Sequence, residues 1–211
     1  PISAARPTEP IDQSQLLALA DVVREATEAF EAFDHTKALE VTEKFFWNFT
    51  DDYLELVKER AYGQGGATPE SQASAVFTLR LSLHVMLQLL APFLPFTTEE
   101  IWSWWQKEAG SIHRSSWPQA VEVSAELDAG NHGLIELAAN ALTTIRKAKS
   151  DSKASMKAEI ETATIEAPAA VLSSLRLFES DLKAVGRIRD LAYEEATEVA
   201  VSNIVLAEVA E

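Results

Sequence analysis

Trp47, Leu54 and Lys58 are the side chains of this sequence whose types and spacing are best suited to binding chemistry. They lie in the segment Phe45–Gly63, FFWNFTDDYLELVKERAYG, which has the pattern of one helix with two different faces. A face that combines Trp, Leu and Lys either packs on a neighbouring helix, as bundles require, or meets a partner from solvent. The pattern alone leaves both interpretations open.

The opposite side of the same helix is an ordinary core face. At about 100° per residue, four large side chains fall within one quadrant. They are Phe45, Phe49, Tyr53 and Leu56. Leu54 lies roughly 145° from that quadrant, on the side of Trp47 and Lys58. Because apolar stripes at helical spacing are usually core, packing against a neighbouring helix is the ordinary interpretation of this second face.

Other helices are expected to position this segment. Residues Pro1–Pro10 contain three prolines and resemble a tail, and Asp12 has the features of an N-cap. The helix that follows has an apolar side, made of Leu16, Leu19, Val23, Ala26, Phe30 and Phe33. Asp34 is placed to cap the next helix, which we expect to run through the segment to Tyr62.

The stretch Val76–Leu90 is ambiguous by pattern. Its apolar residues alternate with polar ones, as in a strand, yet roughly twenty residues pass without a turn signal. Length therefore predicts a helix, which begins at Pro69 and ends before Pro92.

A shorter helix is predicted to follow, ending at Trp105. Thr97 and Glu100 have the spacing of a capping box, and Phe96 and Ile101 have that of a hydrophobic staple. These signals explain the segment without any functional role.

By pattern the chain is mainly α, with a helical bundle over residues 1–118, a linker over 119–131, and a helix plus a small α/β subdomain over 132–211. We expect the helix of the last part to run from about His132 to Lys149.

Two segments of the last part are rich in Ile, Val and Thr and are predicted strands, Glu159–Glu166 and Glu198–Val209. A helical stretch, Ala169–Val185, separates them, and Leu191–Tyr193 is a candidate third strand. Strands are expected only after about residue 158.

The composition bounds the class of protein. Apolar residues make up 47% and charged residues 24%, as in soluble globular proteins. The longest apolar run, Val76–Phe96, is interrupted by polar residues and prolines and is not expected to span a membrane. There is no cysteine, which excludes disulfides and cysteine-based zinc sites.

Charge argues against RNA binding at first sight. The chain has 33 acids and 18 bases, a net charge of −15, whereas a polyanion normally meets a basic surface. The bases are unevenly spread, however. Between Arg146 and Lys157 lie five bases and one acid, which permits a basic patch on an acidic body.

The sequence has no pattern of an active site. Its four histidines are scattered without metal-ligand spacing, and the acidic pairs lie where solvation or helix capping explains them. No nucleophile motif or glycine-rich phosphate loop is present. We therefore expect no catalysis, metal or cofactor in this segment by itself.

Two motifs resemble a known family. The pattern FxDxYLExxK over Phe49–Lys58, followed by LLAPFLPFTTEEIW over Leu89–Trp102, is similar to the anticodon-binding region of valyl-tRNA synthetases, class I aminoacyl-tRNA synthetases. The second motif is shared across the Val/Ile/Leu group, whereas the first points to the valine enzyme. The likeness covers the chain from about Ile11 onward and thins after Pro118.

The resemblance implies roles for the outward face of the segment. It implies that Leu54 packs on an unstacked base of the anticodon loop, since RNA loops present splayed bases. Lys58 would neutralise a phosphate, and Glu55 would accept a hydrogen bond from a base amino group. Trp47 is a further candidate contact, with core packing as the alternative.

The basic run has its own two interpretations. A solvated helix C-terminus, favoured by the helix dipole, is one. Contact of Arg146 and Lys147 with the tRNA backbone is the other, since family members often carry a similar Ile-Arg-basic sequence at this point.

The resemblance implies a tRNA-binding fragment of a cytoplasmic valine ligase, with valine-specific tRNA and the remaining synthetase domains as partners and no membrane. The catalytic HIGH-type and KMSKS-type signatures are absent, so ATP and magnesium would bind other domains. Two departures are Thr50, where the family usually has Cys, and an end at Glu211, before the family's coiled-coil arm.

Two rival functions remain. The same module of an isoleucyl- or leucyl-tRNA synthetase is one, although the isoleucine family commonly adds a cysteine-rich zinc element. An acidic helical protein–protein interaction module without an RNA role is the other.

Overall fold

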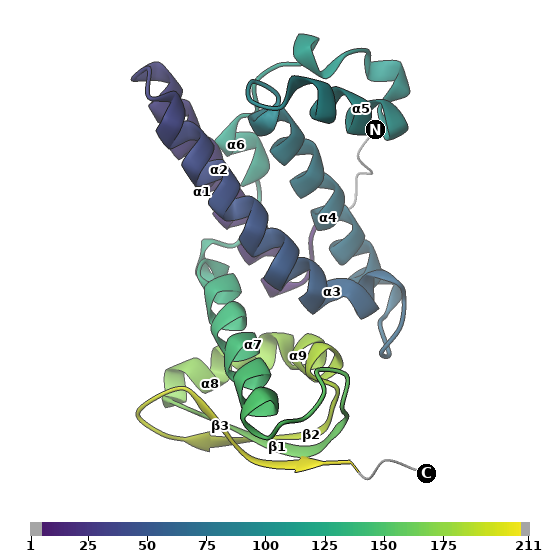
Figure 1. Cartoon of the computed structure of the whole chain (residues 1–211), viewed down its shortest axis with the longest axis vertical. Coiled ribbons are helices and arrows are strands. Elements are labelled where there is room, and N and C mark those ends of the chain that lie inside the picture. The colour runs from purple at the N-terminus through teal and green to yellow at the C-terminus, as the bar shows by residue number, and fades with distance from the viewer. Residues whose placement is uncertain (1–5, 208–211) are drawn as a thin grey trace. The chain divides into compact units, whose positions relative to one another are not determined.

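A computed structural model describes residues 6–207 of the chain as a set of helices followed by one small sheet (Figure 1). These residues form two compact units, each made of two stretches of chain. Unit 1 contains the residues as far as Thr50 and Ala73–His132, and unit 2 contains Asp51–Gln72 and the residues from Gly133 on. Residues 51–72, expected in the first domain, therefore belong to unit 2.

Unit 1 is built on a hairpin of two helices, α1 (Pro10–Glu31) and α2 (His35–Asn48). Asp34 caps α2 as predicted, because its carboxylate accepts a hydrogen bond from the Lys37 backbone N–H at 2.9 Å. The apolar side of α1 is buried at Leu16, Leu19, Val23 and Ala26, whereas Phe33 is exposed.

The start of α1 differs from the prediction. The helix begins at Pro10, two residues before the predicted cap at Asp12. Proline suits the first turn, since that turn has no intrahelical partner for a backbone N–H. Asp12 lies inside the helix, fully buried, and accepts a hydrogen bond from the Ser74 hydroxyl at 2.6 Å. Of the predicted tail, residues 1–5 lie outside the described part of the chain.

The segment from α2 to Ala61 is helical throughout but not uniformly α-helical. A π-helical turn, Phe49–Tyr53, separates α2 from α3 (Leu54–Ala61). Phe49 and Tyr53, at the two ends of this turn, are both buried, as their place in the predicted core quadrant requires. Periodicity at 100° per residue did not predict the turn.

The ambiguous stretch is a helix, as its length predicted: α4 spans Pro69–Leu90. By length and composition alone α4 is apolar enough to cross a membrane, a test that buried core helices also pass. Near its end, Leu87 packs with Trp102 and Ile112. His84 lies against the Trp102 ring, with 4.7 Å between ring centroids, and burial lowers its pKa.

Helix α5 spans Pro95–Trp105, so its predicted end is right and its predicted start is wrong. Proline again begins the helix, which places Thr97 inside the first turn instead of at the cap. Phe96 is 89% exposed and makes no staple with Ile101. Within the first turn, the hydroxyl of Thr98 donates to the Leu94 carbonyl at 2.9 Å.

The segment expected as a linker, residues 119–131, packs within unit 1. It contains a short helix, α6 (Ala120–Val123), which contacts α1, and Val123 is buried. The side-chain oxygen of Gln13 accepts hydrogen bonds from the Asp128 backbone and the Asn131 amide, at 3.1 and 2.8 Å.

Unit 2 combines α3 with an α/β part, as expected for the C-terminal region. Its elements after Gly133 are α7 (Leu134–Asp151), β1 (Ile160–Ala167), α8 (Ala169–Leu175), α9 (Glu179–Gly186), β2 (Ile188–Glu195) and β3 (Ala200–Leu206). All three predicted strands are present, although residues 208 and 209 of the last lie outside the described residues.

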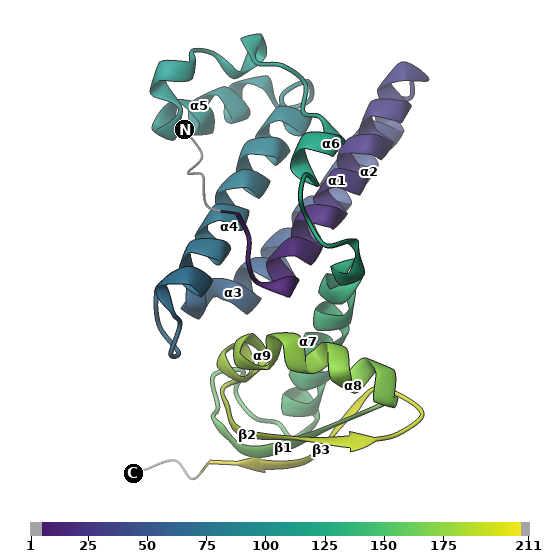
Figure 2. The same cartoon turned by 180° about the vertical axis from the view of Figure 1, so that it is seen from behind.

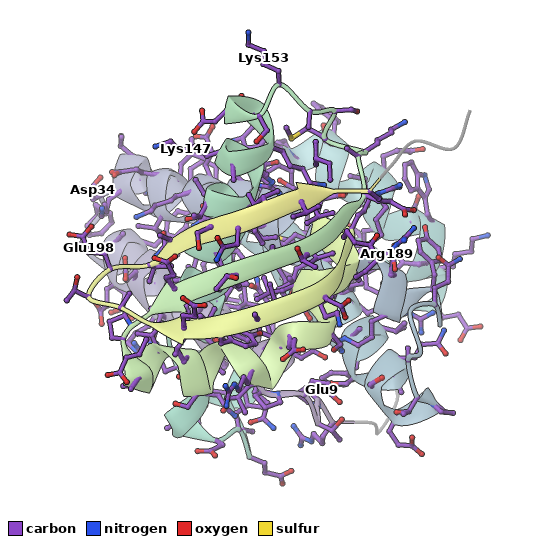
Figure 3. The ribbon with its side chains drawn as sticks, turned by 90° about the horizontal axis from the view of Figure 1, so that it is seen from below. Glu9, Asp34, Lys147, Lys153, Arg189 and Glu198 are labelled. Carbon is purple, nitrogen blue, oxygen red and sulfur yellow. The ribbon has the colours of Figure 1, made fainter. Side chains whose placement is uncertain are left out.

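The sheet has the order β2-β1-β3, with β2 parallel and β3 antiparallel to β1. The parallel pair is joined through α8 and α9, as a parallel connection requires. Figures 1 and 2 show these helices on one face of the sheet, and Figure 3 looks onto the other face.

A buried ion pair fastens α3 to α9. The Arg60 guanidinium donates two hydrogen bonds to the Asp181 carboxylate. Nε donates to Oδ1 and Nη2 donates to Oδ2, each at 3.0 Å. The side chains of Arg60 and Asp181 are only 8% and 7% exposed. Arg60 also donates to the Ser71 carbonyl at 2.9 Å, so one residue fixes α3, α9 and the start of α4.

Candidate nucleic-acid interface

The two faces predicted for the segment are present in the structure. The core quadrant is buried, with at most 6% exposure at Phe45, Phe49, Tyr53 and Leu56. Leu54 is partly exposed and Lys58 is exposed. The second face therefore does not serve as a second core face.

Leu54, Glu55 and Lys58 form what we call the α3 surface. The Lys58 ammonium lies 3.1 and 3.4 Å from the two Glu55 carboxylate oxygens. Both side chains are well exposed, at 50% and 43%. An exposed pair of this kind contributes about 0–1 kcal/mol to stability, so either member can change partner at little cost. The α3 surface thus combines the apolar Leu54 with a cation, Lys58, and a hydrogen-bond acceptor, Glu55, that can both exchange each other for a ligand.

Arg146 of α7 lies at the beginning of this surface. Its Nη2 donates to the Asp51 carbonyl at 2.7 Å, and its Nη1 donates to the Asp52 carboxylate at 3.2 Å. Asp51 and Asp52 belong to the π-helical turn, directly before Leu54. Arg146 therefore holds the turn that presents Leu54, and its charge is paired with that of Asp52.

The acids Asp51 and Asp52 were not predicted to do more than face solvent or cap a helix. Nothing local in the sequence indicates the contact with Arg146, which is more than ninety residues away. In the structure Arg146 is held by the Asp52 carboxylate and by the backbone carbonyl of Asp51.

The rest of the basic run divides into structural and outward-facing residues. Lys149 is 3% exposed and donates to the carbonyls of Met156 and Ala158, at 3.2 and 2.8 Å. Burial and the nearby Arg187 charge lower its pKa. Lys147, Lys153 and Lys157 are exposed, and Figure 3 shows Lys153 extending away from the protein. These three lysines are the cations of the run that remain available to a polyanion.

Trp47 belongs to α2 and hence to unit 1. It is 53% exposed, its indole N–H donates to the Glu43 carboxylate at 3.4 Å, and its ring meets Phe46 edge-on at 5.2 Å between centroids. The structure thus favours solvent contact over core packing for this residue.

Within residues 6–207 there is no cluster of three or more His, Asp or Glu side chains that could hold a metal ion. The arrangement of side chains on the α3 surface is suited to binding, since it combines apolar area, a cation and an acceptor.

Comparison with known proteins identifies the family. The sequence pattern of the family described as "Anticodon-binding domain of tRNA ligase" matches residues 12–165. A valine–tRNA ligase of Thermobifida fusca is 50% identical over 189 residues, which cover 89% of this chain and 20% of that protein. One of Leifsonia xyli is 44% identical over 212 residues, covering 100% and 24%.

A valine–tRNA ligase of Cutibacterium acnes is 50% identical over 186 residues, covering 88% of this chain and 21% of that protein. The chain spans between a fifth and a quarter of the length of these relatives. The matched region begins within α1 and ends within β1, so it contains the α3 surface. The chain belongs to the family of anticodon-binding domains of tRNA ligases, and within it corresponds to the anticodon-binding region of valyl-tRNA synthetases.

Proposed function

We propose that this chain binds the anticodon stem-loop of a valine tRNA, as part of a cytoplasmic valine–tRNA ligase whose other domains activate and transfer valine. The observation that carries the proposal is the α3 surface. Leu54 is partly exposed although the helix has a complete core face, and it lies within the motif that the sequence shares with the family.

Each residue of the site has a distinct part in this proposal. Leu54 packs on a base that leaves the stack of the anticodon loop, since single-stranded RNA bases are recognised by packing on their faces and bonding to their edges. Lys58 exchanges Glu55 for a phosphate, and the freed Glu55 carboxylate accepts from a base amino group. Arg146 keeps Leu54 in place, and Lys147 supplies a cation for the backbone. Trp47 stacks on a further base.

The purpose of this binding is to position the tRNA. Binding energy gained far from the reacting atoms accelerates a reaction when it holds the substrate in the reactive geometry. Gripping the anticodon arm would therefore favour the correct tRNA and hold its acceptor end in the active site. In this proposal ATP and magnesium bind the other domains of the ligase.

The acidic composition is compatible with the proposal because charge is local. Lys147 lies near the end of α7, and Lys153 and Lys157 lie in the loop after it, all three exposed on an otherwise acidic chain. A small cationic area on an acidic body guides the phosphates to one place. It also predicts weak, strongly salt-dependent binding.

A pair of RNA substrates tests the proposal in the full-length ligase. The Leu54→Ala variant should lose about 1–3 kcal/mol in kcat/KM for whole valine tRNA, the scale of one lost base contact. The same variant should charge an acceptor minihelix, which lacks the anticodon arm, at the rate of the unaltered enzyme.

Equal losses on both RNAs would contradict the proposal, since they would indicate damage to the fold or the active site. No loss on either RNA would equally contradict a contact of Leu54 with the anticodon loop.

A further inference from the structure

The solvent side of α5 carries large apolar side chains that the α3 surface does not explain. Phe96 is 89% exposed, Trp104 is 65% exposed, and Leu94, just before the helix, is 48% exposed. Phe96, Glu100 and Trp104 are spaced four residues apart and form one stripe along the helix. We call Leu94, Phe96, Glu100 and Trp104 the α5 surface.

The helix that carries the α5 surface is well packed on its other side. On the opposite side of α5, Trp102 is 3% exposed and packs with Leu87, Ala91 and Ile112. The Trp102 indole N–H donates to the Gly110 carbonyl at 3.0 Å. Trp104 is held outward, since its indole N–H donates to the Glu100 carboxylate at 3.1 Å. Exposed aromatic side chains on a well-packed helix are typical of a contact with another protein surface.

The α5 surface and Trp47 lie at opposite ends of unit 1. The α5 end is marked by the contact of Phe93 with Phe30 near the end of α1, at 5.7 Å between ring centroids. Trp47 lies at the last turn of α2, beside the beginning of α1 in the helical hairpin (Figures 1 and 2). The 18 residues of α4 in unit 1 span about 27 Å between the two ends, at 1.5 Å per residue. An RNA loop that meets Trp47 is therefore far from the α5 surface.

Charge also disfavours RNA at the α5 surface. Glu99, Glu100 and Glu108 lie on or directly after α5, whereas the nearby cations are Lys107 and Arg114, which belongs to a short turn packed against α5. Phosphates would be repelled by this excess of acids. The chemistry that fits is an apolar protein pocket with basic residues at its rim, which would receive the aromatic rings and pair with the glutamates.

We propose that the α5 surface docks onto another domain of the same ligase chain, through such a pocket. The chain spans only 20–24% of the length of its valine–tRNA ligase relatives, so most of the ligase lies outside the structure and can supply this partner. The proposal rests on the proposed function in that it places the chain within the longer ligase. Docking at this end leaves the end with Trp47 open to tRNA.

Hydroxyl-radical labelling of the full-length ligase, read by mass spectrometry, tests the docking. In the structure Trp104 is more exposed than Trp47, so without docking it should be labelled at least as fast. With docking, Trp104 is labelled several-fold more slowly than Trp47 in the absence of tRNA. Addition of valine tRNA then slows the labelling of Trp47 and leaves that of Trp104 unchanged.

A matched pair of variants checks that the protection comes from docking. Phe96→Glu should raise the labelling of Trp104 several-fold, because it places a charge in the apolar pocket. Val121→Glu should not, although Val121 is also highly exposed, since it lies on α6.

Two results would overturn the docking proposal: labelling of Trp104 as fast as that of Trp47 without tRNA, or protection of Trp104 that appears only when tRNA is added. Either result leaves the proposed function intact if tRNA still protects Trp47. Failure of tRNA to protect Trp47 while Trp104 stays protected would count against the RNA contact at Trp47 alone.

Discussion

The two faces of α3 carry nearly the same residue types in different surroundings. On one face Leu56 is 1% exposed and Arg60 is paired with Asp181, away from solvent. On the other face Leu54 is partly exposed and Lys58 is paired with Glu55 in solvent. A leucine and a cation–carboxylate pair thus occur on both faces of an eight-residue helix.

Burial decides what each face contributes. The pair of Arg60 and Asp181 was removed from water, so each charge depends on the other for the interactions it lost. The pair of Lys58 and Glu55 remains hydrated and holds neither partner strongly. The inner face therefore stabilises unit 2, and the outer face is available for a ligand. The predictions below test this division.

The largest expected effect is at Arg60. Arg60→Ala leaves the buried Asp181 carboxylate without its partner, and should lower the free energy of unfolding by about 3–5 kcal/mol. Urea denaturation of the chain measures the loss. The double variant Arg60→Met with Asp181→Leu should recover much of it, since an apolar pair of similar volume can replace a buried ion pair. A loss below about 1 kcal/mol for Arg60→Ala, the value for exposed pairs, would break the comparison.

The next largest loss of stability is expected at Leu56. Leu56→Ala leaves a cavity in the core of unit 2 and should cost about 2–5 kcal/mol of stability. The same denaturation experiment gives the value. A cost within about 0.5 kcal/mol of the unaltered chain, as for surface substitutions, would show that the face is not a packed core.

The two neighbouring bases of α7 extend the comparison. Arg146→Ala should cost about 1 kcal/mol of stability, because it removes two hydrogen bonds from a partly exposed site. Lys147→Ala should stay within about 0.5 kcal/mol. In tRNA binding by the full-length ligase, Lys147→Ala should flatten the salt dependence by about one phosphate contact, whereas Arg146→Ala should lower affinity with little change in slope.

Identical salt slopes for the two α7 variants would contradict this division. They would indicate that Arg146 contacts phosphate itself and that its bond to Asp52 is given up in the complex.

A small effect on stability is also expected at Lys58. Lys58→Ala should change the free energy of unfolding by less than about 1 kcal/mol, and should flatten the salt dependence of tRNA binding by about one phosphate contact. Titrations of the ligase with tRNA at several salt concentrations measure the slope. An unchanged slope would remove Lys58 from the site.

Glu55→Gln sharpens the same test. If Glu55 accepts a hydrogen bond from a base, this variant weakens binding, since the amide is a poorer acceptor than the carboxylate. Tighter binding would instead show that Glu55 only competes with RNA for Lys58.

Much of this arrangement follows from local sequence patterns. The inward and outward sides of the segment, the helix over Val76–Leu90 and the three late strands are set by periodicity, length and β-branched content. The family motif places Leu54 and Lys58 in a functional context that periodicity alone cannot give.

Two kinds of feature could not be predicted from local sequence patterns. The starts of α1 and α5 were expected at Asp12 and Thr97, but Pro10 and Pro95 begin these helices, because proline has no N–H to leave unpaired there and its fixed φ suits the first helical position. Asp12 accepts a hydrogen bond from the Ser74 hydroxyl in place of the predicted capping bond.

The other feature is long-range pairing. Arg60 meets Asp181 and Arg146 meets Asp52 across 121 and 94 residues of chain, and the sequence carries no spacing rule for such pairs. The basic run appeared uniform for the same reason, although Arg146 and Lys149 make intramolecular hydrogen bonds and Lys147 is exposed to solvent.

The central claim is that the outer face of α3 contacts tRNA while its inner face holds the fold. Thermal melts and charging kinetics of full-length Leu54→Ala and Leu56→Ala, measured side by side, test it most directly. The account predicts that Leu54→Ala melts close to the unaltered enzyme and loses about 1–3 kcal/mol in kcat/KM for valine tRNA, whereas Leu56→Ala loses charging only as far as it loses the fold. A Leu54→Ala enzyme that melts much earlier, and charges normally while folded, would contradict it.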